Sequence, residues 1–479
     1  MFSLFRNPRP VVLARPDHCI SRKDIDYDAL RVLYRLHDNG YEAYLVGGGV
    51  RDLLLGRKPK DFDVGTNARP NEIRKMFRNC FLIGKRFRLA HIVYDGGKKI
   101  IETSTFRKAP PQAVQAVPGT EIAPETEGPM LMDDNTFGTP EEDAQRRDFT
   151  VNGLFYNIAD FSVIDYVGGL KDLQKRVIRS IGDPEIRFRE DPVRMMRAVK
   201  FAARLDFTID RAARRAIAKY HDDILMAAPP RVSEEIFRLF SFSSSAKSFR
   251  LLWETKLLQT LFPKISSYVD QTGGDTSPQW DYLQAFDSLP DNDEVQNAAR
   301  LAILLYPVFH SEIQQCSTLS AREEHRGRGG RWRFLQNFER EVLSHVAIPR
   351  GTVIGALNCL FILPRLRERP SFVLGSRFSV CSRDFPNLMA LARAVYAVEG
   401  HSCDLLDEWQ AFHDAEVGQV EDSRHRREDV EEEESLEQES EGEMGSEVSR
   451  PRSSRRRRSH RRHYRGRRRE ERGYTEGKE

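Results

Sequence analysis

The chain has 479 residues and a formal net charge of +3, from 75 lysines and arginines against 72 aspartates and glutamates. This length predicts two or three domains plus tails. No apolar run is long enough to span a membrane, and the six cysteines form no Cys-x-x-Cys pair and no zinc-like spacing. We therefore expect a large soluble protein in a reduced, cytoplasmic setting, without membrane anchor or secretion signal.

The first informative pattern joins a strand to a helix through glycines. The apolar run from Ala43 to Val46 predicts a short buried strand. Three glycines follow, which allow a sharp turn and a close approach of the backbone to a ligand. A helix starts near Val50, so its first N–H groups favour phosphate, and Arg51 adds a positive charge. The glycines are Gly47, Gly48 and Gly49.

Two aspartates come next and alternate with apolar residues. Lys60 to Val64 predicts a strand with Asp61 and Asp63 on one face. Neighbouring carboxylates repel each other unless a divalent cation neutralises them, and hard oxygen ligands select Mg²⁺. Alone, a glycine triplet is usually a turn and an Asp-x-Asp pattern is usually a solvated strand edge. Together they are what nucleotidyl transfer requires.

A third acid, Glu102, lies in a predicted hairpin. His91 to Tyr94 and Lys99 to Phe106 are strand-like and are joined by the turn Asp95-Gly96-Gly97. The hairpin would bring Glu102 onto a strand near the two aspartates. An exposed strand glutamate is the alternative interpretation.

Residues 108–134 are rich in Pro, Ala, Thr and Glu and predict a mobile surface loop. After this segment, Arg146 and Arg147 precede an acid, Asp148, and an amide, Asn152. Arg147 could clamp a triphosphate, while Asp148 and Asn152 could exchange hydrogen bonds with a ribose hydroxyl. A surface loop with a local ion pair is the alternative.

Strand signals fade from Asp165, where Gly168 and Gly169 predict a flexible connection. Arg189 to Leu205 then predicts a helix with a buried stripe. Asp191 and Arg194 share another face of this helix, with Arg197 one turn later; in isolation such a pair is most often a solvated ion pair. This helix is part of a longer helical stretch predicted over Val177 to His221. Further helices are predicted at Val232 to Phe240, Phe249 to Phe262, Asn297 to Val308 and Ala390 to Ala415.

The end of the chain is strongly charged. Glu428 to Glu443 is acidic and Arg450 to Arg469 is dominated by arginine, so residues from Glu416 onward should be disordered in isolation. The arginine block suits RNA phosphates, although a targeting or solubility tail would look the same. Its densest run is Arg455, Arg456, Arg457 and Arg458. Arg326 to Phe334 could also contact RNA, but an exposed loop that leads into a helix explains it slightly better.

These motifs resemble the class II branch of the nucleotidyltransferase superfamily, which contains bacterial poly(A) polymerases and CCA-adding tRNA nucleotidyltransferases. The resemblance rests on LVGGGVRDLLLGRKPKDFDV at Leu45 to Val64, on RRDFT-x-N at Arg146 to Asn152, and on the Glu-Asp-x-x-Arg pattern that ends at Arg194. It extends from about Ile20 to Phe262.

The resemblance implies roles for these residues. Glu102 would complete a carboxylate triad with Asp61 and Asp63 for two Mg²⁺ ions. The glycine turn and Arg51 would bind the nucleotide, together with Arg147, Asp148 and Asn152. Asp191 and Arg194 would read the incoming base in place of a template, and by chemistry alone these two side chains fit either adenine or cytosine. Arg197 would also bind the nucleotide.

The implied fold is α+β, with a small mixed-sheet head and an all-helical remainder. We expect an N-terminal extension over residues 1–24, the head over 25–164, a nucleotide-selecting and RNA-binding neck over 165–230, an RNA-binding body over 231–415, and the charged tail over 416–479.

Three features favour the poly(A) branch. Leu82 to His91 resembles a stretch that separates bacterial poly(A) polymerases from CCA-adding enzymes, the arginine tail resembles theirs, and a His-Asp phosphohydrolase motif is absent from the second half. The expected activity is therefore ATP-dependent polyadenylation of RNA 3′ ends with release of pyrophosphate, and RNA-decay machinery is a candidate partner. A CCA-adding enzyme and a non-catalytic RNA-binding adaptor are the rival functions.

Overall fold

The structure of the chain is a computed structural model that describes residues 9–84, 88–108, 137–290, 295–316, 328–370 and 384–415. The surface loop expected over residues 108–134, apart from its first residue, lies outside these ranges. So does the tail with Arg455 to Arg458. Among the helices that the structure describes, none is both long and apolar enough to cross a membrane.

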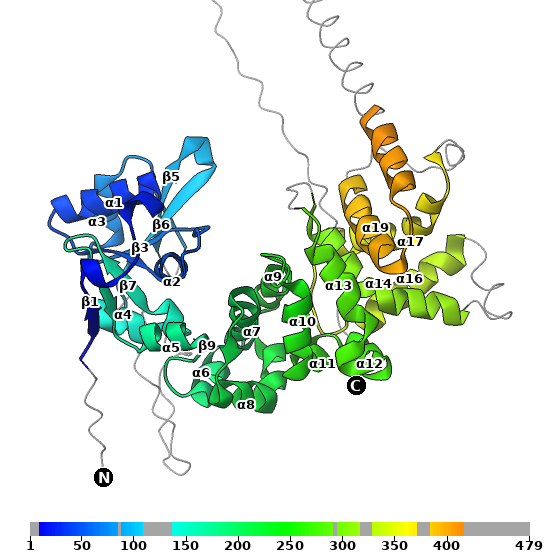
Figure 1. Ribbon diagram of the computed structural model, residues 1–479, viewed down its shortest axis with the longest axis horizontal. Helices are drawn as coiled ribbons and strands as arrows, with labels where there is room; N and C mark the ends of the chain where they lie inside the picture. Colours follow the sequence, from blue (N-terminus) through cyan, green and yellow to red (C-terminus); the bar gives the residue numbers. More distant parts are fainter. Residues whose placement is uncertain are drawn as a thin grey trace, which may run out of the picture. The chain divides into compact units, whose positions relative to one another are not determined.

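The first part of the chain forms a mixed, eight-stranded sheet with the order β1-β8-β7-β2-β3-β6-β5-β4 (Figure 1). Neighbouring strands are antiparallel except β3 and β6, which run parallel. The strands are β1 (Val11–Leu13), β2 (Ala43–Val46), β3 (Asp63–Thr66), β4 (Cys80–Ile83), β5 (Leu89–Tyr94), β6 (Lys99–Thr105), β7 (Leu154–Asn157) and β8 (Val163–Asp165).

Two expectations about these strands need correction. The segment over residues 1–24 is not only an extension, because β1 pairs with β8 and Ile20 is buried in the core. The predicted strand Lys60 to Val64 begins only at Asp63, so Asp61 precedes the strand instead of alternating within it. The predicted hairpin is present, since β5 and β6 are antiparallel and His91 lies opposite Glu102.

The two faces of the sheet have different coverings. The helices α1 (Tyr27–Asp38) and α3 (Pro70–Met76) cover one face, where Leu33 and Ile73 join the large core with Leu45 and Val64. On the other face a smaller apolar cluster forms around α4 (Pro140–Arg146). It contains Tyr44, Val46, Phe106, Ala144 and Phe155. The strand register places Asp63 opposite Val46, so Asp63 points to this second face.

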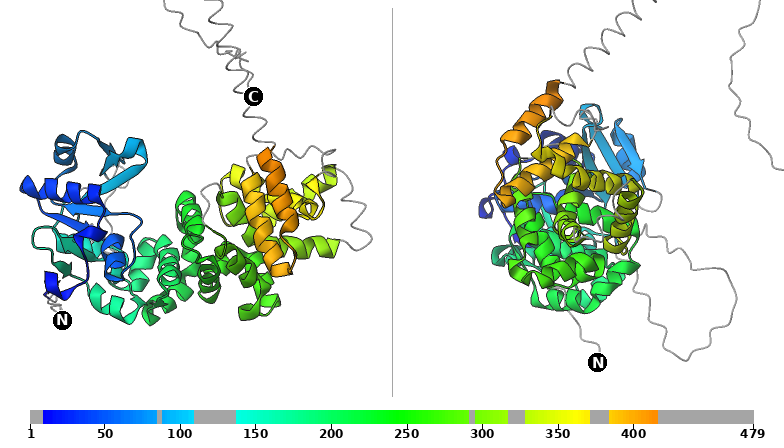
Figure 2. Two further views of the ribbon diagram at one scale, coloured as in Figure 1. Left: turned by 45° about the horizontal axis from the view of Figure 1, so that its top comes forward. Right: turned by 90° about the vertical axis from the view of Figure 1, so that its right-hand side faces the viewer.

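After β8 the described chain is helical except for two short parallel strands, β9 (Val177–Ile178) and β10 (Thr208–Ile209) (Figure 2). These strands correct the prediction of continuous helix from Val177 to His221. The head also contains α2 (Gly48–Leu54), between β2 and β3. The first helices after β8 are α5 (Gly169–Lys175), α6 (Pro184–Glu190), α7 (Val193–Leu205), α8 (Arg211–Tyr220) and α9 (Pro229–Arg238).

The helix predicted over Arg189 to Leu205 is two helices. α6 ends at Glu190, Asp191 is extended with φ −146° and ψ 91°, and α7 begins after Pro192. Proline disfavours the helical conformation of the residue before it, which explains the break. Asp191 and Arg194 therefore do not lie on one helix.

The remaining helices share one continuous apolar core with the preceding ones. They are α10 (Ser245–Glu254), α11 (Leu257–Leu261), α12 (Pro263–Gln271), α13 (Pro278–Asp287), α14 (Asn297–Cys316), α16 (Arg328–Val342), α17 (Arg350–Ile362) and α19 (Phe385–Glu399), followed by a helical segment over residues 404–415. Phe334 packs against Phe309 and Phe338, as expected if the segment Arg326 to Phe334 simply leads into a core helix.

Candidate active site

A cavity of about 760 Å³ gathers almost all of the predicted site residues. It is lined by the glycine turn, by both aspartates of the Asp-x-Asp pair, and by polar residues of three later segments. The predicted residues in its lining are Gly47, Gly48, Gly49, Arg51, Asp61, Asp63, Arg147, Asp148, Asn152, Asp191, Arg194 and Arg197. Glu102 does not line it.

The glycine turn is built for a close approach. Gly47 caps α2 with φ +71°, a conformation that favours glycine. A Cβ atom there would lie 2.8 Å from Nη1 of Arg147. Arg147 is held in this position by Asp143, whose Oδ2 accepts from its Nη2 at 2.9 Å, and by the ring of Phe155. The turn and the Arg147 guanidinium thus meet in the cavity wall, where phosphate oxygens could contact both.

The acids carry more negative charge than the protein around them balances. Burial, together with the charges of Glu102 and Asp61, raises the pKa of Asp63 to about 6, although the charge of Arg147 opposes the shift. Thr103 pairs with Val64, so Glu102 lies level with Asp63 on the neighbouring strand. The Glu102 side chain is 51% exposed and lies 3.5 Å from Nε2 of His91. In the described part of the chain, no three His, Cys, Asp or Glu side chains are already arranged to hold a metal ion.

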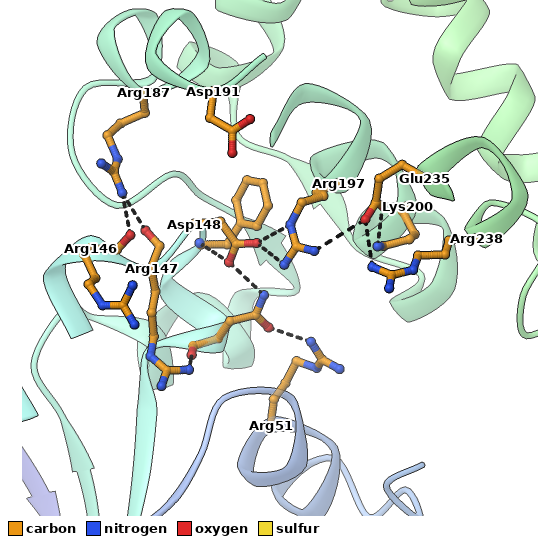
Figure 3. Close-up of polar contacts among 12 residues, drawn as sticks. Arg51, Arg146, Arg147, Asp148, Arg187, Asp191, Arg197, Lys200, Glu235 and Arg238 are labelled. Carbon is orange, nitrogen blue, oxygen red and sulfur yellow. Dashed lines mark hydrogen bonds and ion pairs between the residues drawn. The ribbon is translucent and has the colours of Figure 1, made fainter. Parts of the chain in front are cut away.

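A chain of hydrogen bonds links the head to α7 (Figure 3). The Arg51 side chain is buried and donates to Oδ1 of Asn152 at 2.5 Å and to Asp52 at 2.8 Å. Asn152 donates to Oδ1 of Asp148 at 3.1 Å, and Arg197 donates to Oδ2 of Asp148 at 2.6 and 2.8 Å. Arg51 therefore orients Asn152 in this structure, whereas the sequence suggested a free positive charge for phosphate.

Asp148 is ionised despite its burial. Burial raises the pKa of its carboxyl group, but the charge of Arg197 and hydrogen bonds from Asn152 and Arg197 outweigh this and hold the pKa below its usual value. The same pairing raises the pKa of Arg197. The two side chains form a fixed ion pair between the loop after α4 and helix α7.

The two side chains expected to read a base have other partners. Asp191 accepts from Nη1 and Nη2 of Arg231 at 3.0 and 2.8 Å. Arg194 donates to the carbonyl oxygen of Arg187 at 3.2 Å and to Glu190 at 3.3 Å. Asp191 and Arg194 both line the cavity from the two sides of the Pro192 break.

Sequence reasoning missed several residues of the cavity wall. Glu235 of α9 accepts from Lys200 at 2.5 Å and from Arg238 at 3.0 Å, and lies 3.6 Å from Arg197 (Figure 3). Burial lowers the pKa of Lys200 to about 8, although Glu235 opposes the shift. The spacing of Arg194, Arg197, Lys200 and Arg204 is a helical stripe that the sequence already displayed. The other missed residues, including Arg231 and Phe242, come from segments without a recognisable pattern.

Two further contacts fix this wall to the head. Nη2 of Arg187 donates to the carbonyl oxygens of Arg146 and Arg147 at 2.8 and 2.9 Å. Nη2 of Arg204 donates to Oδ2 of Asp52 at 2.8 Å. Helix α2 and the loop after α4 are therefore held to helices α6 and α7 by polar contacts that need both parts of the chain.

Comparison with known families agrees with this arrangement. Residues 43–179 match the family model described as "Poly A polymerase head domain", and residues 206–269 match "Probable RNA and SrmB- binding site of polymerase A". The cavity-lining residues Gly47 to Arg147 lie in the first match, and Arg231 to Phe242 lie in the second.

Curated relatives belong to both branches. Poly(A) polymerase I of Escherichia coli O6:H1 is 47% identical over 308 residues, which are 64% of this chain and 65% of the relative. The CCA-adding enzyme of Lactobacillus gasseri is 38% identical over 230 residues, 48% of this chain and 54% of the relative. The chain thus spans less than two thirds of the length of either relative.

The crystal structure of the Bacillus stearothermophilus CCA-adding enzyme in complex with CTP has the same fold, with a TM-score of 0.54 at 24% identity over 81% of this chain and 80% of that one. Over these stretches the chain is therefore similar to poly(A) polymerases and to CCA-adding enzymes, and it shares the fold of a CCA-adding enzyme.

Proposed function

We propose that the protein is a polynucleotide adenylyltransferase that adds AMP from ATP to RNA 3′ ends and releases pyrophosphate. The observation that carries this proposal is the single cavity in which Asp61 and Asp63 meet the glycine turn and the side chains Asp191, Arg194 and Arg197. One bound nucleotide could therefore contact the acids, the glycine turn that suits its phosphates and the side chains that suit its base.

The acids fit Mg²⁺ by charge and by donor type. Asp63 is largely buried, and its pKa is raised first by this burial and then by the charges of Glu102 and Asp61; a divalent cation would stabilise the ionised carboxylate against both effects. Carboxylate oxygens are the ligands that Mg²⁺ prefers. We assign Asp61 and Asp63 as ligands, with Glu102 as the third acid once its side chain leaves His91. Bound Mg²⁺ would lower the pKa of the RNA 3′-hydroxyl and neutralise charge on the triphosphate.

The protein groups then position the reactants. The backbone of Gly47 to Gly49 and the guanidinium of Arg147 hold the triphosphate, and Asn152, oriented by Arg51, faces the ribose. The RNA 3′-oxygen forms a bond to the α-phosphorus of ATP as the bond from that phosphorus to the pyrophosphate oxygen breaks. The hydroxyl proton passes to solvent, and no covalent enzyme intermediate is required.

Similarity to relatives favours the addition of AMP alone over the addition of the sequence CCA. The poly(A) polymerase of Escherichia coli is more similar to this chain than the Lactobacillus CCA-adding enzyme is, with 47% against 38% identity over a longer match. Asp191 can accept from the exocyclic amine of adenine and Arg194 can donate to a ring nitrogen, provided that Asp191 shares or releases Arg231.

We assign residues 25–164 to the catalytic head, 165–230 to the neck, 231–415 to an RNA-binding body and 416–479 to a charged tail, with RNA-decay machinery as a partner. The match of residues 206–269 to the RNA-binding model supports the RNA contact. A reducing, cytoplasmic setting is supported by free thiols at Cys19, Cys80, Cys359 and Cys403.

A primer-extension assay tests the activity. The full chain is incubated with Mg²⁺, a labelled single-stranded RNA and one nucleoside triphosphate at a time. We expect a long ladder with ATP alone, none with Asp61→Asn, and a normal ladder with the control Asp95→Asn, an acid of the hairpin turn outside the cavity. Growth limited to a few residues that needs CTP and a tRNA-like end would identify a CCA-adding enzyme. RNA binding without any extension would identify an adaptor.

A further inference from the structure

One aromatic side chain of the cavity wall has no role in the proposed chemistry. Phe242 lies in the turn between α9 and α10, lines the cavity that contains Asp61 and Asp63, and is 51% exposed. A single exposed phenylalanine needs no explanation by itself. Its backbone and its neighbours distinguish this one.

The backbone holds the ring outward at an energetic cost. Phe242 and Ser243 have φ of +64° and +48°, a left-handed conformation that is unfavourable for residues other than glycine. The surrounding contacts enforce it: Ser244 donates to the carbonyl oxygen of Ser241 at 2.8 Å, and the buried Asp287 accepts from the backbone N–H of Ser245 at 3.0 Å. Such strain is found where a function requires the conformation.

One face of the ring is covered by an arginine that is tied to the head. The guanidinium carbon of Arg204 lies 3.6 Å from the centroid of the Phe242 ring. Arg204 donates to Asp52 of α2, and Arg57 donates to the carbonyl oxygens of Arg204 and Leu205 at 3.2 and 3.4 Å. The ring is therefore fixed relative to the head, although it belongs to the body side of the chain.

The reacting acid is within electrostatic reach of this stack. Burial lowers the pKa of Arg204, while Asp52 and, more weakly, Asp61 raise it. Arg238 lines the same cavity and adds positive charge for phosphates. A flat ring, a cation stacked on it and a nearby catalytic acid form the kind of surface on which single-stranded nucleic acids place a base.

We propose that Phe242 is the stacking platform for the base of the 3′-terminal nucleotide of the RNA, with Arg204 as the residue that positions its ring. The inference rests on the proposed function, because it places the RNA end beside Asp61. The incoming nucleotide offers the same stacking chemistry, but its base is assigned to Asp191, Arg194 and Arg197. The experiment must therefore separate the two bases.

Equilibrium binding of RNA gives the first readout. Each variant is made in the full chain with Asp63→Asn, so that no transfer occurs, and is titrated with a fluorescent RNA that ends either in adenosine or in an abasic nucleotide. We expect Phe242→Leu and Phe242→Gly to bind the normal RNA roughly 5- to 150-fold more weakly, the range for one base stack, and to bind the abasic RNA as the parent does. Phe242→Trp should keep the affinity for the normal RNA.

Three controls accompany these variants. Phe81→Leu removes an exposed phenylalanine of β4 that does not line the cavity, and should leave RNA affinity unchanged. Phe242→Gly relieves the left-handed strain, so its melting temperature should not fall. With Asp63 intact, the KM for ATP should be the same in Phe242→Leu as in the parent.

Several outcomes would overturn the inference. Unchanged affinity of Phe242→Gly for the normal RNA would do so, as would an equal loss on the abasic RNA. A raised KM for ATP with normal RNA binding would move the ring to the incoming base. Failure of the proposed function appears separately, as absence of ATP-dependent extension by the parent chain.

Discussion

Asp63, a proposed ligand of Mg²⁺, is costly to the fold when it is ionised. Its carboxyl group is largely buried beside two other acids, and its pKa in the folded chain is about 6 against 3.8 for the free side chain. Between these values the folded protein binds a proton that the unfolded chain has lost. The contribution of Asp63 to stability is therefore present below about pH 4 and is lost as the pH rises through 6.

Asp63→Asn should consequently stabilise the metal-free protein at pH 7.5, by about 1–3 kcal/mol, because the amide carries no charge to desolvate. Urea unfolding in the presence of a chelator, measured from pH 4 to 8, would show the difference growing with pH. Mg²⁺ should raise the stability of the parent and not that of the variant. A difference that is independent of pH would contradict the assignment, and Asp95→Asn serves as the control.

The Asp148–Arg197 pair depends on mutual neutralisation. Arg197→Gln leaves the Asp148 carboxylate buried without its main cation, so we expect a loss of about 2–4 kcal/mol in the free energy of unfolding. Asp148→Asn in the same chain should restore part of it, because the unpaired charge disappears. A double-mutant cycle by urea unfolding measures this coupling. Simple additivity of the two single losses would exclude a direct pair.

The residue types of the site could be predicted from the sequence, but their partners could not. Asp61, Asp63, Arg147 and Asn152 were identified from short-range patterns, and all line the cavity. Arg231 pairs with Asp191 across 40 residues of sequence, a contact that only tertiary packing decides. The same reason explains why the burial of Arg51 was not predicted.

The sequence predicted secondary-structure elements best where the turn between them had distinctive residues. The β5–β6 hairpin was predicted from Asp95-Gly96-Gly97, and all three residues have positive φ. The α6–α7 break was missed because the apolar stripe continues across it, although Pro192 was the available signal. The strand at Asp63 is shorter than its alternation suggested, since only residues 63–66 find a neighbouring ladder.

Helix α5 packs against the turn that carries Asn152. A Cβ at Gly169 would lie 2.2 Å from the carbonyl oxygen of Thr150, which is backbone and cannot rotate away. Gly169→Ala should therefore shift η4 (Thr150–Asn152), lower stability by about 1–3 kcal/mol and raise the KM for ATP.

Gly351→Ala is the matched control, because a Cβ there meets nothing within 4 Å at the start of α17. It should raise stability by up to about 1 kcal/mol, since glycine is unfavourable in a helix, and leave the KM for ATP unchanged. Thermal unfolding of both variants, together with steady-state kinetics, checks the pair. Equal effects of the two substitutions would show that packing at residue 169 is unimportant.

On the scale of the whole molecule, RNA affinity should have a large electrostatic part from the arginine block after Arg450. Deletion of residues 450–479 should weaken RNA binding and reduce the slope of log K against log salt, because fewer phosphates are neutralised. The KM for ATP and the extension rate at saturating RNA should remain the same. Binding isotherms at several salt concentrations measure the slope, and identical slopes would assign the block another role.

Phe242 is the last residue of the cavity lining in the described part of the chain, and the matched family models end at residue 269. Among the residues that the structure describes, the helices from α10 onward add core and surface to the body but no side chain to the lining of the cavity. Recombination could therefore exchange the gene segment that encodes these later helices without changing the cavity, provided that the new helices fill the same core. Under the proposed function, the choice of RNA can therefore be inherited separately from the reaction at its 3′ end.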